Sequence, residues 1–258
     1  MGKVWFVGAG PGDPDLITIK GRALVEQAGA VLYAGSLVAK AALDWAKPDA
    51  VTADSKGMTL EEIADWLALQ ANRCETVVRL QTGDPSLFGA LIEMVRPLDQ
   101  LGIEVGVVPG VSSAFASAAA GVESLTLPEV TQTVILTRFS GRTPMPQGED
   151  LESLAKHHCS LCIFLSITLF DQVEAALLKA GWDEWSPIMV VEKASWPGEE
   201  RVFKAPLNQM AALIETNGIK AQAMIVASPT LGARDWDEIT KSKLYDPEFT
   251  HRFRKAAR

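Results

Sequence analysis

The sequence has 258 residues, a length that suits one large domain or two compact ones. Hydrophobic residues make up 48% of it and charged residues 22%, a composition that excludes disorder as the main state of the chain. The formal net charge is −8. Proteins that bind nucleic acid by bulk electrostatics need a basic face, so that class is disfavoured.

Charge is spread evenly over two halves of the chain and differs only in a short tail. Residues 1–112 and residues 113–235 each carry a net charge of −5, whereas residues 236–258 carry +2. A short basic tail of this kind is typical of a solvated terminus.

Targeting and metal-binding signals are absent from the sequence pattern. The apolar start is too short for a signal peptide, and no apolar run reaches the length of about 18 residues that a membrane span needs. The three cysteines are too few for a disulfide framework. The run from His157 to Cys162 lacks the second cysteine pair of a structural zinc site. We therefore expect a cytoplasmic protein with no membrane contact and no metal.

The first half alternates short apolar runs with stretches that have helical periodicity. The predicted strands are residues 4–7, 30–33, 76–80 and 105–108. The predicted helices are residues 19–27, 60–71 and 86–98. Strands that alternate with helices favour a mainly parallel sheet with ligands at the carboxyl ends of its strands.

The second half begins such a pattern again. Its predicted strands are residues 133–137, 161–166, 188–192, 201–204 and 223–227. Its predicted helices are residues 150–156, 170–179 and 207–215. We predict an α/β fold of two lobes, 1–112 and 113–235, followed by the tail 236–258, with residues 112–122 joining the lobes. A cleft between two lobes is a preferred place for a ligand.

A loop of glycine and proline, residues 8–14, follows the first predicted strand. A dinucleotide-binding loop requires a glycine where Asp13 stands, and a helix that opens within the loop. Pro11 and Pro14 resist helix formation, and Asp13 would repel a phosphate. The loop is either a tight strand-to-helix turn or a stiff segment whose backbone approaches a ligand closely.

Two further glycine turns follow predicted strands. Residues 82–85 come after the strand at 76–80, and residues 109–113 come after the strand at 105–108. Asp84 is also expected to cap the helix that follows, with Pro85 at its first position. We expect three such turns at the carboxyl ends of strands to line a pocket with backbone groups and small side chains, which suits a zwitterionic, cationic ligand better than a polyphosphate.

Together these residues resemble the S-adenosylmethionine-dependent tetrapyrrole (corrin/porphyrin) methyltransferases. Residues 7–14, with 16–18 and Gly21 behind them, are similar to the opening signature of that family. Residues 79–85 are similar to its second signature and residues 108–113 to its third. One glycine loop alone would be weak evidence, but the ordered set is specific.

Five further segments resemble the branch of the family that methylates carbon 11 of precorrin-4 in cobalamin biosynthesis. These segments are residues 33–38, 131–138, 141–144, 192–197 and 222–225. The resemblance covers nearly all of the chain before the tail. It implies two α/β lobes, commonly in a homodimer, with S-adenosylmethionine between the lobes, S-adenosylhomocysteine as product and the tetrapyrrole in an adjoining trough.

The resemblance also implies particular contacts with the cofactor. Carried over residue by residue, these contacts are Pro11, Gly83, Asp84, Leu87, Ser112, Ser113, Leu165 and Ala194. Two positions depart from the pattern of related uroporphyrinogen methyltransferases. Leu165 stands where they typically have Met, and Ala34 stands where they carry an Asp that is the proposed base. No catalytic base can therefore be assigned.

The chemistry of methyl transfer explains why the sequence shows no catalytic triad and no carboxylate pair. The positive sulfur already activates the methyl group, so the protein mainly has to orient the two reactants, which contributes about 7–11 kcal/mol. A tetrapyrrole with several carboxylates needs cations in this acidic protein. Arg138 and Arg142 are the best candidates, and Lys193 and Lys56 are weaker ones.

Other functions stay open at this point. A second hypothesis keeps the cofactor and changes the methyl acceptor. The acceptor would then be another corrin ring position, a cobalt-containing precorrin-4, or a more distant RNA or protein substrate, although the acidic halves argue against RNA. A nucleotide-dependent oxidoreductase is a weaker alternative that rests on residues 8–10, and Asp13 argues against it. A tetrapyrrole carrier without catalysis is the fourth hypothesis.

Overall fold

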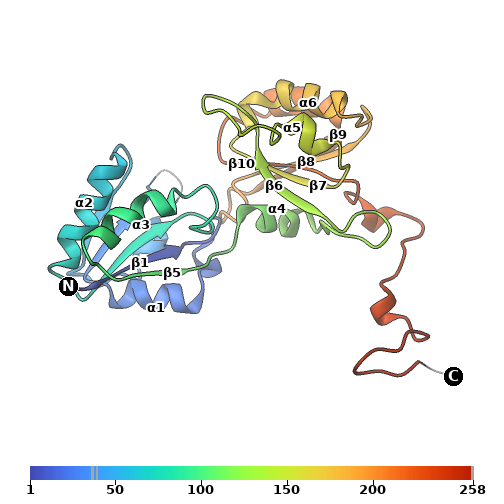
Figure 1. Ribbon diagram of the computed structural model, residues 1–258. Helices are drawn as coiled ribbons and strands as arrows, with labels where there is room; N and C mark the ends of the chain where they lie inside the picture. Colours follow the sequence, from blue (N-terminus) through green and yellow to red (C-terminus); the bar gives the residue numbers. More distant parts are fainter. Residues whose placement is uncertain (36–37, 39, 257–258) are drawn as a thin grey trace. The chain divides into compact units, whose positions relative to one another are not determined.

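The computed structural model describes residues 1–35, 38 and 40–256, which form two compact α/β units (Figure 1). The N-terminal unit contains Met1–Ala116 and Lys193–Glu200, and the C-terminal unit contains Ser117–Glu192 and Arg201–Arg258. Each unit has its own five-stranded sheet, which confirms the predicted α/β fold with two lobes. The segment Lys193–Glu200 belongs to the N-terminal unit although both strands that it connects belong to the other.

The sheet of the N-terminal unit is entirely parallel, in the order β3-β2-β4-β1-β5. Its strands are β1 (Lys3–Gly8), β2 (Ala30–Tyr33), β3 (Val51–Asp54), β4 (Thr76–Gln81) and β5 (Val105–Val108). The parallel sheet predicted for the first half is confirmed. The edge strand β3 was not predicted, because it is short and largely exposed and therefore shows no apolar run.

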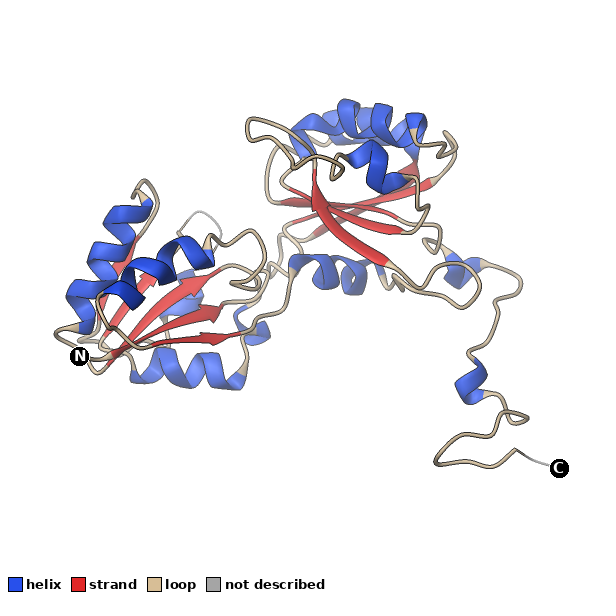
Figure 2. Cartoon of the chain, in the orientation of Figure 1, coloured by secondary structure: helices blue, strands red, loops and turns tan. Residues whose placement is uncertain are grey.

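Helices cover both faces of this sheet (Figure 2). These helices are α1 (Ile19–Gln27), α2 (Leu60–Ala71) and α3 (Leu91–Gln100). A fourth helix, α4 (Ser113–Gly121), follows β5 in the chain. One apolar cluster packs β1, β2 and β4 against α2 and α3, and a second packs the opposite face against α1. Local caps set the helix starts: Thr59 and Glu62 form a reciprocal capping box at α2, a typical N-terminal signal.

The helix predicted at residues 86–98 begins later than expected. In the structure α3 starts at Leu91, and residues 82–90 form a loop. Phe88 and Ala90 have positive φ values of 54° and 49°, and this left-handed backbone interrupts a helix. The predicted helix cap by Asp84 is therefore wrong, and its carboxylate bonds elsewhere, as described below.

The sheet of the C-terminal unit is mixed, in the order β6-β7-β10-β8-β9, and only the pair β6–β7 is parallel. Its strands are β6 (Val134–Arg138), β7 (Ser160–Phe164), β8 (Pro187–Glu192), β9 (Arg201–Pro206) and β10 (Ala223–Ala227). Its helices α5 (Leu151–Ala155), α6 (Phe170–Lys179) and α7 (Leu207–Thr216) share one core cluster with the sheet. Gly181, at φ 92°, follows α6, and a left-handed glycine is a common end of a helix.

The sequence also led us to expect no membrane contact and no metal site. No helix among the described residues has the length and apolar character of a membrane span, and no three of their His, Cys, Asp or Glu side chains gather as metal ligands. Cys162 is fully buried in β7, and burial raises the pKa of its thiol to about 12. The thiol is therefore un-ionised at neutral pH, which suits a packing role.

Candidate functional site

Three loops of the N-terminal unit meet through their backbones at the carboxyl ends of β1, β4 and β5. A Cβ atom added to Gly110 would lie 2.0 Å from the carbonyl oxygen of Gly83, and one added to Gly8 would lie 2.6 Å from the same oxygen. Gly83 in turn donates a hydrogen bond to the carbonyl of Gly10 at 2.7 Å. Glycine is therefore required at this junction, because any side chain would force the loops apart.

Asp84 joins two of these loops. Its Oδ2 accepts a hydrogen bond from the backbone N–H of Gly110 at 2.9 Å, and its Oδ1 accepts from the N–H of Ser86 at 2.8 Å and from the Ser86 hydroxyl. Burial acts to raise the pKa of Asp84, but the hydrogen bonds from Ser86 and Gly110 outweigh it and lower the pKa below 3.8. Asp84 is thus an ionised brace and not a proton acceptor at neutral pH.

Acidification is expected to remove the contribution of Asp84 to stability. Because its folded pKa lies below the unfolded value of 3.8, the carboxylate stabilises the fold above that value, and the effect is lost as the pH falls through the folded pKa. In Asp84→Asn the amide nitrogen cannot accept a hydrogen bond, so this pH dependence disappears. Urea unfolding of both proteins from about pH 6 down to about pH 3 should show their stability difference narrowing with acid; a constant difference would contradict the assignment.

The first glycine loop ends well before the helix that follows it. Asp13 accepts from the N–H of Asp15 at 2.9 Å and begins a short 3-10 turn. Helix α1 starts only at Ile19, after the cap Thr18. A dinucleotide loop would present the N-terminus of a helix to the pyrophosphate, and this loop does not. The geometry thus argues against the oxidoreductase hypothesis.

A hairpin loop clasps the first glycine loop from a distant part of the sequence. We call residues 193–200 the clasp loop. The indole Nε1 of Trp196 donates to the carbonyl of Pro11 at 3.1 Å, and the hydroxyl of Ser195 accepts from the N–H of Asp13 at 3.0 Å. A Cβ atom added to Gly12 would lie 2.1 Å from the Trp196 ring, so the ring lies flush against the backbone there.

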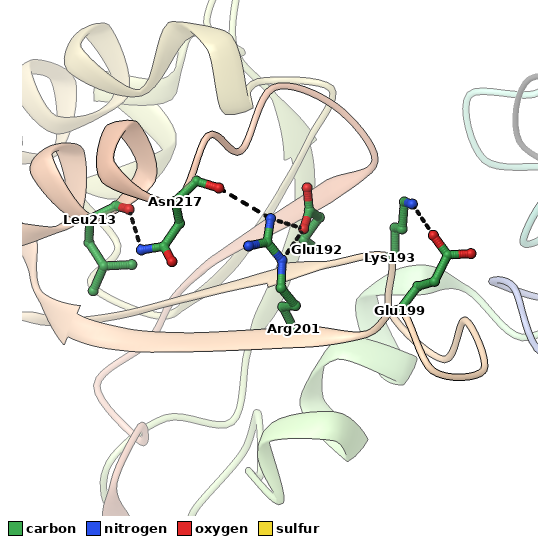
Figure 3. Close-up of polar contacts among 6 residues, drawn as sticks. All are labelled: Glu192, Lys193, Glu199, Arg201, Leu213 and Asn217. Atoms are coloured by element: carbon green, nitrogen blue, oxygen red, sulfur yellow. Dashed lines mark hydrogen bonds and ion pairs between the residues drawn. The ribbon is translucent and has the colours of Figure 1, made fainter.

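The clasp loop is held in an unusual backbone conformation. Lys193 and Ser195 have φ values of 50° and 67°, which non-glycine residues adopt at a cost of about 1–3 kcal/mol. Glu200 accepts a hydrogen bond from the N–H of Ser195 at 2.6 Å, and Lys193 forms an ion pair with Glu199 (Figure 3). Such strain persists only where surrounding contacts maintain it and is typical of functional sites.

The strands on either side of the clasp loop are tied as well. The Nε of Arg201 donates to the carboxylate of Glu192 at 2.6 Å, across the β8–β9 pair. The Nη2 of the same arginine donates to the carbonyl of Asn217 at 3.3 Å (Figure 3). The structure thus places Ala194, 6% exposed, in a segment fixed at both ends. Lys193, a weaker candidate for a substrate contact, is engaged with Glu199 within the loop.

The remaining predicted contacts of the N-terminal unit lie in the same loops. Ser112 is buried and its hydroxyl accepts from the N–H of Ala114 at 3.3 Å, where α4 begins at Ser113. Leu87 is half-buried and donates its N–H to the carbonyl of Asp84 at 3.2 Å. Pro11, Gly83 and Asp84 complete the set already described. In the segment 33–38, residues 36 and 37 lie outside the described residues.

In the C-terminal unit the predicted residues lie at the carboxyl ends of the parallel pair β6 and β7. Leu165 follows β7, is 69% exposed and has φ 54°. Its neighbour Ser166 accepts from the N–H of Phe139 at 2.8 Å and donates to the carbonyl of Phe164 at 2.6 Å. An exposed leucine in a left-handed conformation is a conspicuous surface feature, because the conformation is strained for a residue of this size.

Arg138 stabilises the loop that follows β6. Its guanidinium donates to the carbonyls of Thr143 at 3.0 Å and Pro144 at 2.8 Å, which closes residues 139–144 into a compact loop. Arg142 lies exposed on that loop. Sequence reasoning did not foresee this division, in which Arg138 shapes the loop and Arg142 is displayed on it.

Comparison with known proteins gives one consistent picture. The model of the tetrapyrrole (corrin/porphyrin) methylases matches residues 3–211. The chain is 46% identical to the cobalt-precorrin-4 C(11)-methyltransferase of Priestia megaterium, with 99% of both chains covered. It is 42% identical to the precorrin-4 C(11)-methyltransferase of Pseudomonas aeruginosa, with 97% of this chain and 98% of that protein covered.

Solved structures agree with this result. An X-ray structure of a cobalt precorrin-4 methyltransferase has a TM-score of 0.86 at 46% identity and covers 89% of this chain and 95% of its own. The uroporphyrin-III C-methyl transferase of Thermus thermophilus complexed with S-adenyl homocysteine has a TM-score of 0.73 at 29% identity, with 90% and 94% covered. The chain therefore belongs to the tetrapyrrole (corrin/porphyrin) methylases, a family of S-adenosylmethionine-dependent enzymes.

Proposed function

We propose that the protein transfers the methyl group of S-adenosylmethionine to carbon 11 of precorrin-4 in cobalamin biosynthesis. The observation that carries this proposal is full-length similarity, at 42% and 46% identity, to methyltransferases named for that carbon atom. The glycine junction and the clasp loop support it, because they form the kind of site that methyl transfer needs.

The loops of the N-terminal unit fit a cationic, zwitterionic cofactor. They offer main-chain groups and small side chains, and no helix opens within the first loop to receive a phosphate. Pro11, Gly83, Asp84, Leu87, Ser112, Ser113 and Ala194 would hold the cofactor there, and Leu165 stays a predicted contact of the C-terminal unit. S-adenosylmethionine supplies a methyl group that its positive sulfur has already activated.

The chain's own contribution to the reaction is orientation. Asp84 holds the second and third loops together, and Trp196 holds the first, so the cofactor loops are pre-formed. Holding two reactants in line contributes about 7–11 kcal/mol to the barrier reduction. Ala34 stands after Tyr33, where an acidic base would be expected, which fits a reaction in which orientation dominates.

Locating the transferred methyl group tests this proposal. The protein is incubated with precorrin-4 and S-adenosylmethionine carrying a 13C-labelled methyl group, and the product is analysed by NMR. Label at carbon 11 supports the proposal, whereas label at another ring carbon, or no transfer to either form of precorrin-4, overturns it. A carrier without catalysis would bind the tetrapyrrole and transfer no label.

Cobalt-precorrin-4 is the second candidate substrate. Two relatives at 46% and 45% identity, from Priestia megaterium and Methanocaldococcus jannaschii, are named for the cobalt form, whereas that at 42% is named for the metal-free form. Parallel measurements of kcat/KM with the two forms decide between them.

We propose that the assembly is a homodimer, which light scattering of the purified protein tests.

Arg142 is proposed to bind a substrate carboxylate from the loop that Arg138 shapes. Arg142→Ala is expected to weaken tetrapyrrole binding about tenfold, the range for one charge-assisted hydrogen bond. Arg138→Ala should weaken it further, since the carbonyls of Thr143 and Pro144 lose their donor. Fluorescence titration with uroporphyrin III and calorimetry with S-adenosylhomocysteine measure both affinities. Cofactor affinity should be unchanged, and unaltered porphyrin affinity in both variants would remove these residues from the substrate site.

A further inference from the structure

A buried arginine lies near the carboxyl end of β4, in the centre of the N-terminal sheet. Arg79 is 5% exposed, and its strand neighbours in register are Phe6 and Leu32, both fully buried. It lies on the same face of β4 as Val77, which belongs to the apolar cluster under α2 and α3. Burial of a cation in such surroundings is expensive unless an anion pairs with it.

The guanidinium of Arg79 has one hydrogen bond within the described residues. Nη1 donates to the hydroxyl of Ser55 at 2.9 Å, and that hydroxyl donates in turn to the carbonyl of Tyr33 at 3.1 Å. The buried Nε has no partner among the described residues. The Nε edge, which arginine uses together with Nη2 for bidentate carboxylate binding, is thus not used by the fold.

No acidic side chain of the described residues forms an ion pair with Arg79. Asp54 is the acidic group whose charge it feels, but the Oδ1 of Asp54 already accepts from the N–H groups of Gly35 at 2.9 Å and Lys56 at 2.8 Å. Burial lowers the pKa of Arg79 to about 10, and the charge of Asp54 only partly offsets this. Arg79 therefore stays a cation at neutral pH with its charge incompletely balanced.

A second buried polar atom lies two residues further along the same face. Gln81 is 5% exposed and donates through Nε2 to the carbonyl of Gly89 at 2.7 Å, while its Oε1 has no partner among the described residues. Buried polar atoms without partners are rare in native proteins and call for an explanation. Two of them on one face, where parallel strands end, indicate a place built to bind a polar group.

We propose that Arg79, oriented by Ser55, binds a carboxylate of the tetrapyrrole substrate through its Nε edge. This proposal rests on the proposed function, which supplies a macrocycle with several carboxylates. The apolar neighbours strengthen such a pair, because charges interact more strongly where water is excluded. The proposed contact lies within the N-terminal unit, where no acidic side chain of the described residues forms an ion pair with Arg79.

Arg79→Met tests the site because a substrate role and a framework role predict opposite results. The probe is uroporphyrin III, a stable polycarboxylate macrocycle, followed by fluorescence titration. Removing the charge-assisted contact should weaken porphyrin binding about 10- to 100-fold, leave S-adenosylhomocysteine affinity within about twofold, and keep or raise the melting temperature, since an unbalanced buried charge is removed. Arg22→Met, which removes an exposed arginine paired with Glu26, is the matched control and should change neither affinity.

Two further variants keep the test decisive. Arg79→Lys preserves the buried charge but lacks the Nε edge, so it should fold normally and still bind porphyrin at least fivefold more weakly. Ser55→Ala removes the orienting hydroxyl and should have a smaller effect in the same direction. Porphyrin affinity equal to wild type in Arg79→Met and Arg79→Lys overturns the proposal, as does a parallel fall of both affinities and the melting temperature. If the wild-type protein methylates precorrin-4 under those outcomes, only this inference fails; if it neither binds porphyrin nor methylates, the proposed function fails too.

Discussion

Gly110→Ala is expected to reduce the affinity for S-adenosylhomocysteine at least 100-fold. The added Cβ would lie 2.0 Å from the carbonyl oxygen of Gly83 and 2.8 Å from the Cα of Gly8, so three loops must separate. These obstacles are backbone atoms that have no rotamer to change, and overpacking of this kind costs about 1–3 kcal/mol or more. Calorimetric titration measures the affinity, and thermal unfolding measures the accompanying loss of stability.

Gly218→Ala is the control for the cost of a glycine substitution. Gly218 has φ 65° and no atoms within 4 Å of an added Cβ, so alanine there introduces backbone strain without a steric clash. Its stability should fall by about 1 kcal/mol, and cofactor affinity should not change. If Gly110→Ala bound the cofactor as tightly as Gly218→Ala does, the glycine junction would not shape the binding site.

Trp196→Ala is the second substitution with a large expected effect. It removes the hydrogen bond to the carbonyl of Pro11 and the ring that lies against Gly12, so the first glycine loop loses its clasp. We expect cofactor affinity to fall about 10- to 100-fold and stability to fall by about 1–3 kcal/mol, less than for a fully buried aromatic residue. Both quantities are read from the titration and unfolding experiments used for Gly110.

Trp196→Phe separates the two contributions of the indole. The smaller ring keeps an aromatic contact with Gly12 but cannot donate to Pro11, so its affinity should fall between those of wild type and Trp196→Ala. Trp185, which is 61% exposed in the C-terminal unit, provides a matched control: Trp185→Ala should leave cofactor affinity unchanged. Wild-type cofactor affinity in Trp196→Ala would rule out a positioning role for the clasp loop.

Elements with strong local signals were predicted accurately from the sequence. The bounds of α1, α2 and α6 agree with the predicted helices, because apolar spacing defines them and, for α1 and α2, Thr18 and Thr59 cap their first turns. The buried strand β10 was equally clear. The order of the three glycine loops places them at the carboxyl ends of β1, β4 and β5, where the structure shows their backbones in contact; that they bind a cofactor stays a prediction.

The start of α3 could not be predicted from the residues next to it. Asp84 followed by Pro85 has the composition of a helix start, but the Asp84 carboxylate bonds Gly110, a residue 26 positions away in the sequence. Residues Phe88 and Ala90 then adopt left-handed backbone, which neither side chain favours. Asp84 thus keeps its local hydrogen bond from Ser86 and adds the distant one from Gly110, and the left-handed backbone at Phe88 and Ala90 delays the start of the helix.

Contacts between distant segments left no trace in periodicity or spacing. The hydrogen bond from Trp196 to Pro11 joins residues 185 positions apart, and the bond from Asp13 to Ser195 joins residues 182 positions apart. Arg79 lies in a strand whose other residues are mostly apolar, and sequence alone does not show that its Nε is buried without a partner among the described residues. The chemistry of these residues depends on what the fold places around them.

The assignment of the clasp loop bears on how this protein can be divided. Expression of residues 1–116 alone would yield a fragment with its sheet intact but without the indole and hydroxyl that secure the Pro11 turn. The N-terminal half is therefore incomplete without the other half, and an exchange of the C-terminal half would have to preserve the eight-residue segment Lys193–Glu200.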